Sequence, residues 1–335
     1  MFPTRMTNRV VDLSDRPVRL SVQNSLLVLH FSSNGEEARG RSEAVEKSYR
    51  CEQLQNPDEL TIPLSDIAVL IVSHPQVSLS HAVLAGLASS GGVFVACNEK
   101  HLPVSMLLPL ASHSLQTERF AAQAAAPLPL KKRAWRQIVR AKIRAQAQLI
   151  EERASSDRGL LALAARVRSG DPANVEAQAA RIYWRELFGV NGFRRDPDAG
   201  GVNACLNYGY AILRATVARA ICGAGLHPSL GVHHHNRYDT FCLADDLMEP
   251  FRPVVDREVA KIAEGPGKDF PLDLESKRTV LKVLLGRFTA NGESRTLFDW
   301  ASRVASSLVA VIENRQDLLD IPLIRPTAES ADENS

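Results

Sequence analysis

Residues 109–130 read PLASHSLQTERFAAQAAAPLPL, and the character of the sequence changes across this stretch. The stretch is rich in Ala, Gln and Ser and ends in Pro127-Leu128-Pro129, which is typical of a connecting segment. Before it the apolar residues form short runs, whereas after it they recur at helical spacing. We therefore predict two domains, 1–109 and 131–325, joined by a connecting segment at 110–130 that carries a helix of its own.

The N-terminal domain is predicted to be small and rich in β-strands. Short runs of β-branched and alternating apolar residues are separated by polar turns, one of them at Ser33–Gly35. One helix is expected over Ser78–Ser90, where apolar residues keep helical spacing and Gly91-Gly92 follows. The expected strands are Arg9–Leu13, Val18–Val22, Leu26–Phe31, Ile67–Val72, Val93–Ala96 and Val104–Leu108.

The second domain is predicted to be larger and all-helical, which makes the fold class α+β. One helix is expected to start with Asp171 as its N-cap and Pro172 at its first position. Another is expected to break at Pro250 and Pro253, and the acidic tail 326–335 is expected to be disordered. The expected helices are Leu130–Arg153, Pro172–Phe188, Val202–Cys222, Asp239–Glu264, Leu274–Phe288 and Leu297–Asn314.

The composition is that of an ordinary globular protein. The chain has 335 residues, a net charge of +2, 45% hydrophobic residues and 23% charged residues. Its five cysteines form no CxxC pair, which argues against a disulfide framework and against a structural zinc site. No secretory signal is visible, nor any apolar stretch of the ~18 residues that a membrane span needs. We therefore expect a soluble, cytoplasmic protein without a membrane segment.

Glu176 is the first candidate for a catalytic acid. It lies within a predicted apolar helix face that includes Ala173, Ala180 and Trp184. A carboxylate on an inward face is costly unless a cation compensates its charge. A metal ion would do so, and a salt bridge to Arg181 or to another arginine is an equally good explanation.

The run His233-His234-His235 is the second candidate. A surface cluster would explain it, and weak adventitious metal binding is a second explanation. However, Asp245, Asp246 and Glu249 follow on one side of a predicted helical turn. Acids at that spacing repel unless a cation lies among them, although the first turn of a helix also favours acids. Oxygen-rich ligands with one imidazole suit Mg²⁺ or Mn²⁺ better than Zn²⁺. Such an ion would activate a nucleophile and neutralise charge on a phosphoryl oxygen.

Two polar stripes are candidates for DNA contacts. The first is basic, and a stripe of one sign suits phosphate contacts, although a charge run is more often a solvated face. The second places asparagines inside a helix, where they suit a metal site, a DNA backbone or hydrogen bonds between helices. The first stripe consists of Lys132, Arg136, Arg140 and Arg144, and the second of Asn203, Asn207, Tyr210 and Arg214.

Several stretches resemble one family, in the same order along the chain. They are NVEAQAARIYW at 174–184, NACLNYGY at 203–210, AGLHPSLGVHH at 224–234 and DLMEPFRP at 246–253, with RVVDL at 9–13 and TIPLSD at 61–66. The sequence resembles the CRISPR-associated integrase ("Cas one"), the catalytic subunit of spacer acquisition, and within it the type II branch. The likeness covers nearly the whole chain.

The resemblance implies a metal triad of Glu176, one histidine and Glu249. The resemblance favours His234 because of the spacing between this histidine and the last acid, and it implies Asp246 as a possible auxiliary ligand. The resemblance also implies a homodimer, with two dimers flanking a dimer of a second, smaller acquisition protein, and an N-terminal domain that makes dimer or partner contacts. The expected reaction is attack by the 3′-hydroxyl of a double-stranded protospacer DNA on a phosphodiester at the CRISPR repeat, with associated endonuclease activity.

Two other functions remain open from the sequence. A stand-alone metal-dependent DNA nuclease or junction resolvase could use the same triad without a partner protein. A non-enzymatic DNA-binding scaffold could use the acids only to neutralise basic neighbours.

Overall fold

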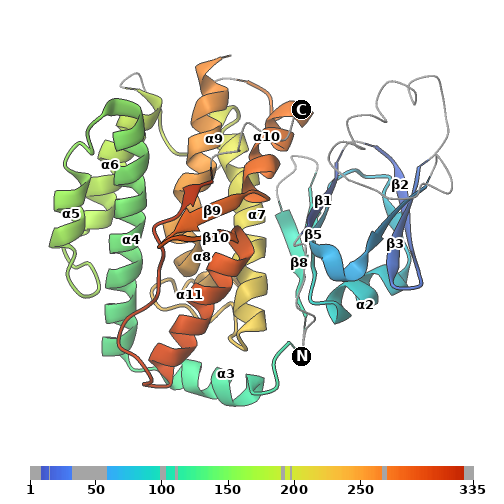
Figure 1. Ribbon diagram of the computed structural model, residues 1–335, viewed down its shortest axis with the longest axis horizontal. Helices are drawn as coiled ribbons and strands as arrows, with labels where there is room; N and C mark the ends of the chain where they lie inside the picture. The colour runs from blue at the N-terminus through green and yellow to red at the C-terminus, as the bar shows by residue number, and fades with distance from the viewer. Residues whose placement is uncertain are drawn as a thin grey trace. The chain divides into compact units, whose positions relative to one another are not determined.

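The computed structural model describes residues 9–14, 16–31, 59–98, 103–109, 112–189, 193–196, 198–265 and 270–327. They belong to two compact units, Met1–Leu110 and Ala111–Ser335, which we describe separately (Figure 1). The predicted turn at Ser33–Gly35 lies outside the described residues, and so does the predicted disordered tail 326–335 after Thr327. The prediction was wrong for the first two residues of that tail, because Pro326 pairs with Phe288 in a strand and the backbone N–H of Thr327 donates to the carbonyl oxygen of Arg287 at 2.9 Å. None of the helices in the described ranges is long and apolar enough to cross a membrane.

The first unit contains two four-stranded sheets. In one sheet β1 (Arg9–Leu13), β5 (Ile67–Val72) and β7 (Val93–Cys97) are parallel neighbours, and β8 (Pro103–Leu107) pairs antiparallel with β7. In the other sheet the order is β4-β3-β2-β6. These strands are Glu59–Pro63, Leu26–Phe31, Val18–Gln23 and Ser78–Leu79, and the 3₁₀ turn η1 (Leu64–Asp66) and helix α2 (His81–Ser89) complete the unit.

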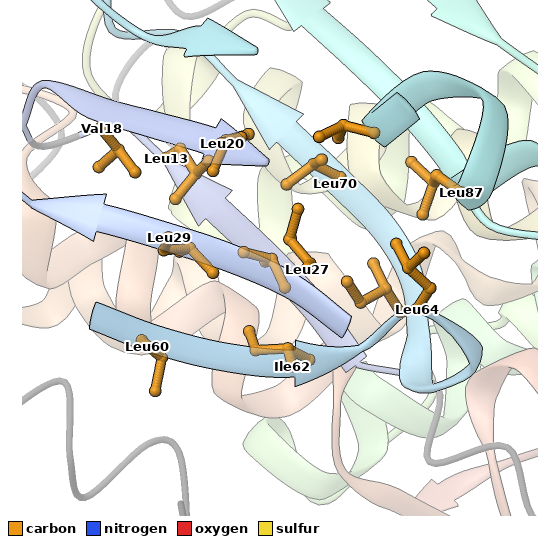
Figure 2. Close-up of a cluster of buried hydrophobic side chains, with 13 residues drawn as sticks. Leu13, Val18, Leu20, Leu27, Leu29, Leu60, Ile62, Leu64, Leu70 and Leu87 are labelled. Carbon is orange, nitrogen blue, oxygen red and sulfur yellow. The ribbon is translucent and has the colours of Figure 1, made fainter. Parts of the chain in front are cut away.

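The core of this unit consists of branched aliphatic side chains (Figure 2). Strand β5 reads IAVLIV, and its first five residues are all buried, because a continuous apolar run suits a strand that is covered on both faces. Strand β2 instead alternates at its start, with Val18 and Leu20 buried and Arg19 exposed, as expected for a strand with one wet face. The predicted strands therefore form where the apolar pattern placed them.

The second unit is built around α7 (Val202–Gly223), in which only a few residues reach the surface. Helices α8, α9, α10 and α11 all pack against it. In a second group, α5 and α6 pack on α4 (Figure 1). The remaining bounds are α3 Gln116–Ala125, α4 Leu128–Ala154, α5 Leu160–Arg166, α6 Val175–Phe188, α8 Cys242–Met248, the 3₁₀ turn η2 Glu249–Phe251, α9 Arg252–Glu264, α10 Leu274–Leu284 and α11 Leu297–Ile312.

The α+β prediction, a strand-rich part followed by a larger helical part, is confirmed. The second unit is not all-helical, however, because it also contains a small sheet of order β10-β9-β11. The predicted helix Leu274–Phe288 ends at Leu284, and β9 (Arg287–Ala290) and β10 (Glu293–Thr296) then form a hairpin across Asn291-Gly292. Both turn residues have positive φ, so this Asn-Gly pair is a hairpin signal that the sequence interpretation missed. Strand β11 is Arg325–Pro326.

Helix α6 starts later than predicted. Its first residue is Val175 and its N-cap is Asn174, whereas Asp171 has a φ of +47° and precedes a turn. The carboxylate of Asp171 still serves the helix, because it accepts hydrogen bonds from the backbone N–H groups of Val175 and Glu176, both at 2.9 Å. Two side chains therefore share the capping of the helix that carries Glu176.

We predict that Gly209→Ala destabilises the second unit by about 1–3 kcal/mol, a typical cost of overpacking. A β-carbon at this position of α7 would lie 2.4 Å from Cγ1 of Val255 on α9 and 3.0 Å from Cγ1 of Val280 on α10. Gly223→Ala, in the same helix, is the matched control, because a β-carbon there has no atom within 4 Å. Urea denaturation should separate the two variants, and equal stability of both would contradict this packing.

Candidate active site

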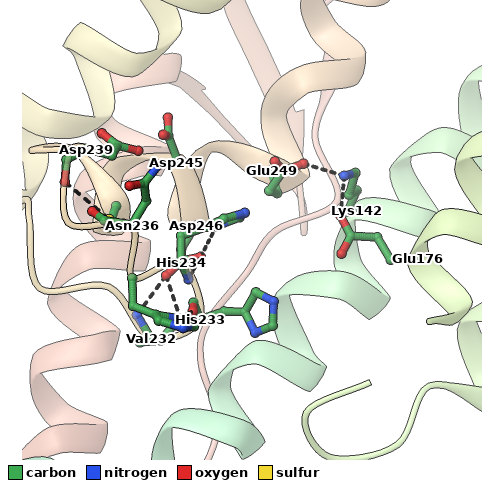
Figure 3. A network of polar contacts seen from close by, with 12 residues as sticks. Lys142, Glu176, Val232, His233, His234, Asn236, Asp239, Asp245, Asp246 and Glu249 are labelled. Carbon is green, nitrogen blue, oxygen red and sulfur yellow. Dashed lines mark hydrogen bonds and ion pairs between the residues drawn. The ribbon is translucent and has the colours of Figure 1, made fainter. Parts of the chain in front are cut away.

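Lys142 of α4 joins the two predicted acids, Glu176 of α6 and Glu249 of η2. Its Nζ lies 2.6 Å from Glu176 Oε1 and 2.6 Å from Glu249 Oε2 (Figure 3). The Lys142 side chain is 11% exposed, that of Glu249 is 5% exposed and that of Glu176 is 24% exposed. Two carboxylates that are far apart in the sequence therefore converge on one positive charge in a largely buried site.

The electrostatics of this cluster favour the charged forms. Burial by itself lowers the pKa of Lys142, but Glu249 and Glu176 outweigh burial, so the pKa of the ammonium is raised. Burial likewise raises the pKa of Glu249, but Arg252 and Lys142 outweigh it and the pKa is lowered. Arg252 Nη2 lies 3.3 Å from Glu249 Oε1, so this acid is held between two cations.

An interruption of the helix directs Glu249 toward α4. Helix α8 ends at Met248, Glu249–Phe251 forms a 3₁₀ turn, and α9 starts at Arg252. Pro250 has no N–H to donate and Pro253 lies in the first turn of α9, where a proline is tolerated. The break that was predicted at these prolines is present, and η2 packs against α4.

Asp246 organises the histidine loop. Its side chain is completely buried, and Oδ2 accepts hydrogen bonds from the backbone N–H groups of Val232 at 2.7 Å and His233 at 2.9 Å. Oδ1 lies 2.6 Å from Nδ1 of His234 (Figure 3). The hydrogen bond to Asp246 is the largest cause of the raised pKa of His234. Because Asp246 engages Nδ1, Nε2 is the ring nitrogen of His234 that can act on a ligand.

The other two histidines have different surroundings. The ring of His233 stacks on Trp135 of α4, with centroids 4.1 Å apart and planes at 3°. Burial is the largest cause of its lowered pKa. His235 is exposed, and its Nδ1 lies 2.7 Å from the carbonyl oxygen of His233. The geometry therefore distinguishes three histidines that the sequence alone could not separate.

Gly231 allows this loop to close tightly. A β-carbon there would lie 2.3 Å from the carbonyl oxygen of His234 and 3.0 Å from Asp246 Oδ2. No side chain fits between these groups without moving the backbone of His234. Gln123 of α3 holds the start of the loop through the carbonyl oxygens of His227, at 3.0 Å, and Leu230, at 2.9 Å.

The donor set of the site fits a hard divalent cation. Within the described ranges, no group of three or more His, Cys, Asp or Glu side chains is already arranged around a metal position. The two glutamates nevertheless converge on a single cation, the ammonium of Lys142. The negative charge of Glu249 is one of the smaller causes that raise the pKa of His234, after the hydrogen bond to Asp246. Two carboxylates and one imidazole nitrogen are suitable ligands for Mg²⁺ or Mn²⁺.

Lys142 and Arg252 are the charged residues that the sequence interpretation missed. Lys142 belongs to the basic run, but it lies next to buried Ile143 and one turn after Ile138, and not on the predicted basic stripe. A cation on the apolar face of a helix is itself a signal, because its burial requires an acidic partner.

A buried triad of polar groups lies next to these charges and joins three helices. Asp256 of α9 is 1% exposed and accepts hydrogen bonds from the hydroxyls of Tyr183 on α6, at 2.6 Å, and Tyr210 on α7. The guanidinium of Arg252 lies 4.7 Å from the centre of the Tyr210 ring. Burial raises the pKa of Asp256 to about 6 despite both hydrogen bonds.

The asparagine stripe of α7 makes contacts within the protein. Asn203 Oδ1 accepts from Nη1 of Arg195 at 3.0 Å, and Asn207 Oδ1 accepts from Nη2 of the same guanidinium. Arg214 forms two bonds with Asp245, Nε to Oδ1 at 2.6 Å and Nη2 to Oδ2 at 2.9 Å. The predicted alternative, hydrogen bonding between helices, holds for Arg214 and Asp245 of α8, whereas the two asparagines bond to the segment that precedes α7.

The basic stripe on α4 differs along its length. Lys132 and Arg144 are exposed, whereas Arg136 and Arg140 are half-buried. Nε of Arg140 donates to the carbonyl oxygen of Ala164 at 3.1 Å, which fixes the guanidinium against α5. The stripe therefore combines two exposed side chains with Arg140, whose guanidinium is anchored.

We predict that Lys142→Met lowers the free energy of unfolding in EDTA by about 3 kcal/mol, because it leaves two neighbouring carboxylates without their shared cation. Mn²⁺ should then raise the melting temperature of the variant more than that of the unchanged protein. Arg153→Met, which removes a more exposed pair with Glu264, is the control. The assigned contacts would be contradicted if Lys142→Met had the same melting temperature as Arg153→Met both in EDTA and in Mn²⁺.

The raised pKa of Asp256 makes stability depend on pH. The folded state binds the proton of Asp256 more tightly than the unfolded state, in which the pKa is near 3.8. The stabilising contribution of Asp256 to the free energy of unfolding is therefore complete below pH 4 and is lost as the pH rises through about 6. We expect the unchanged protein to lose stability relative to Asp256→Asn across this window. Denaturant titrations at several pH values measure the difference, and parallel profiles for the two proteins would contradict it.

Comparison with known proteins identifies the family. A family model described as "CRISPR associated protein Cas1" matches residues 39–270. The CRISPR-associated endonuclease Cas1 of Neisseria meningitidis serogroup C is 36% identical over 278 residues, which cover 82% of this chain and 91% of that protein.

Two solved structures are similar in fold. A casposase bound to integration product has a TM-score of 0.71 at 20% identity, covering 93% of this chain and 92% of that one. A chain of a Cas6-RT-Cas1–Cas2 complex has a TM-score of 0.70 at 15% identity, covering 95% of this chain and 36% of that one. With a family model that matches most of its length and a relative that aligns with four fifths of it, this chain belongs to the CRISPR-associated Cas1 family.

Proposed function

We propose that this chain is the catalytic subunit of CRISPR adaptation, a metal-dependent enzyme that joins the 3′-hydroxyl ends of protospacer DNA to the CRISPR repeat. The observation that carries the proposal is the convergence of Glu176 and Glu249 on one cation beside a histidine that is oriented by a buried carboxylate. The name of the Neisseria relative, an endonuclease, and the integration product in the casposase structure support the reaction class.

Glu176, Glu249 and His234 would hold one Mg²⁺ or Mn²⁺ ion. When bound, the ion supplies Lewis acidity, activating the attacking hydroxyl and neutralising charge on the phosphoryl group. Asp246 orients the imidazole of His234 through Nδ1, so we propose it as a positioning residue in place of an auxiliary ligand. Arg252 keeps Glu249 ionised and in place.

Lys142 has a second part in this mechanism. Both of its carboxylate partners are proposed ligands, so the Lys142 ammonium would share them with a bound ion. Its positive charge would lie near the reacting phosphodiester, where it would stabilise the extra negative charge of the transition state. With a 3′-hydroxyl as the nucleophile, a new phosphodiester would form as the bond from phosphorus to the leaving 3′-oxygen of the repeat strand breaks, and the outcome would be strand joining. With water as the nucleophile the same bond would break and the outcome would be cleavage.

The basic stripe Lys132, Arg136, Arg140 and Arg144 would hold DNA phosphates, because it lies on the helix that brings Lys142 to the site. Asn203, Asn207 and Arg214 would act by positioning Arg195 and Asp245 and not by touching DNA.

The proposed assembly is a homodimer of this chain together with a second small acquisition protein, two dimers of the first flanking a dimer of the second. A similar fold occurs in the Cas6-RT-Cas1–Cas2 complex, which supports such a partner. The N-terminal domain 1–109 would make the dimer or partner contacts. A stand-alone nuclease with the same triad is the second candidate, favoured by the name of the Neisseria relative.

We predict that Glu176→Ala, His234→Ala and Glu249→Ala each abolish Mn²⁺-dependent joining of a short 3′-hydroxyl duplex to a repeat-bearing plasmid in the presence of the partner. Glu186→Ala, on the same helix, and His235→Ala, in the same loop, should keep the activity. Glu186 pairs with the exposed Arg158 and Arg185, and the exposed His235 is hydrogen-bonded through Nδ1 to the backbone carbonyl oxygen of His233.

Three other outcomes would change the assignment. Activity that survives His234→Ala but is lost in His233→Ala or His235→Ala would move the imidazole ligand within the run. Metal-dependent cleavage without the partner, and no joining, would favour the stand-alone nuclease. DNA binding with neither activity would favour a scaffold.

A further inference from the structure

The segment before α4 holds the end of α7 and the loop that leads from it to the histidine run. Side chains of residues 112–123 donate hydrogen bonds to backbone carbonyl groups of this stretch. Ser112 Oγ donates to the carbonyl oxygen of Cys222 at 2.5 Å, and Arg119 Nη1 donates to that of Ala224 at 2.8 Å. The last carbonyl groups of a helix need partners from outside it. The predicted connecting segment therefore caps a helix of the catalytic domain.

Gln123 of α3 continues these contacts with three hydrogen bonds to the loop. Its Nε2 donates to the carbonyl oxygens of His227, at 3.0 Å, and Leu230, at 2.9 Å, and its Oε1 accepts from the backbone N–H of His227 at 2.8 Å. The residue is 3% exposed. Both N–H donors of this amide and its carbonyl oxygen are thus used on one short turn. A single buried side chain therefore fixes both ends of the turn from His227 to Leu230.

This turn runs directly into the backbone of His234. Gly231 follows Leu230, and a β-carbon on Gly231 would lie 2.3 Å from the carbonyl oxygen of His234. The two backbone segments are therefore in close contact, without room for a side chain between them. A contact packed this closely transmits a displacement of one segment to the other. Movement of the turn that Gln123 holds would consequently displace the imidazole of His234.

Other supports of the loop come from α8. The backbone N–H of Leu243 donates to the carbonyl oxygen of Pro228 at 2.7 Å, and Asp246 accepts from the backbone N–H groups of residues 232–234. These bonds remain when the amide of Gln123 is removed. Its loss should therefore loosen the loop on the side of α3 without unfolding the unit.

We propose that Gln123 is a positioning residue of the joining reaction, which acts on the imidazole of His234 through the turn His227–Leu230. The proposal rests on the proposed function, in which His234 is a ligand of the ion. A ligand must keep its lone pair directed at the ion, and a displacement of about 1 Å can cost about a hundredfold in rate. The connecting segment 110–130 is thereby part of the scaffold of the active site as well as a link between two domains.

The first test is amide hydrogen exchange in EDTA, which requires neither metal nor DNA. Gln123→Met keeps a side chain of similar length and removes its donors and its acceptor. The informative amides are those of residues 232–234, because they donate to Asp246 and not to Gln123. We expect them to exchange about tenfold faster in Gln123→Met, the effect of losing about one net hydrogen bond, while amides in the middle of α7 exchange as in the unchanged protein.

Gln316→Met is the matched control. Nε2 of Gln316 also donates to two backbone carbonyl oxygens, those of Ser307 at 3.1 Å and Leu318 at 2.8 Å, but these belong to α11 and the segment after it. The control therefore removes the same kind of bridge elsewhere in the unit. It should leave the exchange of residues 232–234 unchanged.

The second test measures the ion and the reaction separately. Calorimetric titration with Mn²⁺ should give an affinity about tenfold lower for Gln123→Met, as is typical when support of a metal ligand is lost. In the joining assay, kcat should fall about tenfold at a fixed Mn²⁺ concentration, while KM for the DNA duplex stays the same. Gln123→Glu should show the same losses, because an ionised carboxylate accepts from the N–H of His227 but cannot donate to the two carbonyl oxygens.

Several results would overturn the proposal. Unchanged exchange of residues 232–234 in both Gln123 variants would do so, and so would faster exchange combined with the Mn²⁺ affinity of the unchanged protein. Faster exchange throughout α7 would mean a role in overall stability only, and full activity of Gln123→Glu would mean that the two donated bonds have no part. If the unchanged protein joins no DNA, the proposed function fails, while the exchange and Mn²⁺ measurements still decide the role of Gln123.

Discussion

The rest of the site depends on two ion pairs, which join Lys142 to Glu176 and to Glu249. Two acids on different elements approach each other only because a cation from a third element compensates both charges. The lysine thereby fixes α4, α6 and η2 relative to one another. The same compensation marks a position for positive charge between the two carboxylates, which is where the proposed divalent ion would bind.

Two buried carboxylates support this centre without belonging to it. Asp246 gathers three backbone N–H groups and one ring nitrogen of the histidine loop, which gives His234 a defined orientation. Asp256 ties Tyr183 of α6 to Tyr210 of α7, and Arg252 lies over the ring of Tyr210 while it contacts Glu249. The helices that carry the proposed ligands are therefore held by polar contacts that are specific in direction, as well as by apolar packing.

The sequence predicts most of this fold, because its strands and helices follow strong apolar periodicities. Strands β1, β3 and β5 have the predicted bounds, whereas the hairpin β9-β10 was missed, because the periodic apolar pattern ran on into it. The family motifs indicate Glu176, His234 and Glu249. They cannot show that Lys142 compensates the two acids, because Lys142 lies outside these motifs and far from both acids in the sequence. Trp184 is only half-buried, so the prediction that it lies on the core face of α6 was wrong. A helix with apolar residues on two faces does not reveal which face the neighbouring helices cover.

The most direct test of the central claim is a crystal structure of the protein grown with Mn²⁺, with anomalous data collected to locate the ion. The account predicts one anomalous peak bound by carboxylate oxygens of Glu176 and Glu249 and by Nε2 of His234, with Lys142 Nζ moved away from at least one of the acids. A structure in which Lys142 keeps both contacts and Mn²⁺ binds elsewhere, or in which the ion is held by His233 or His235 without the two glutamates, would contradict it.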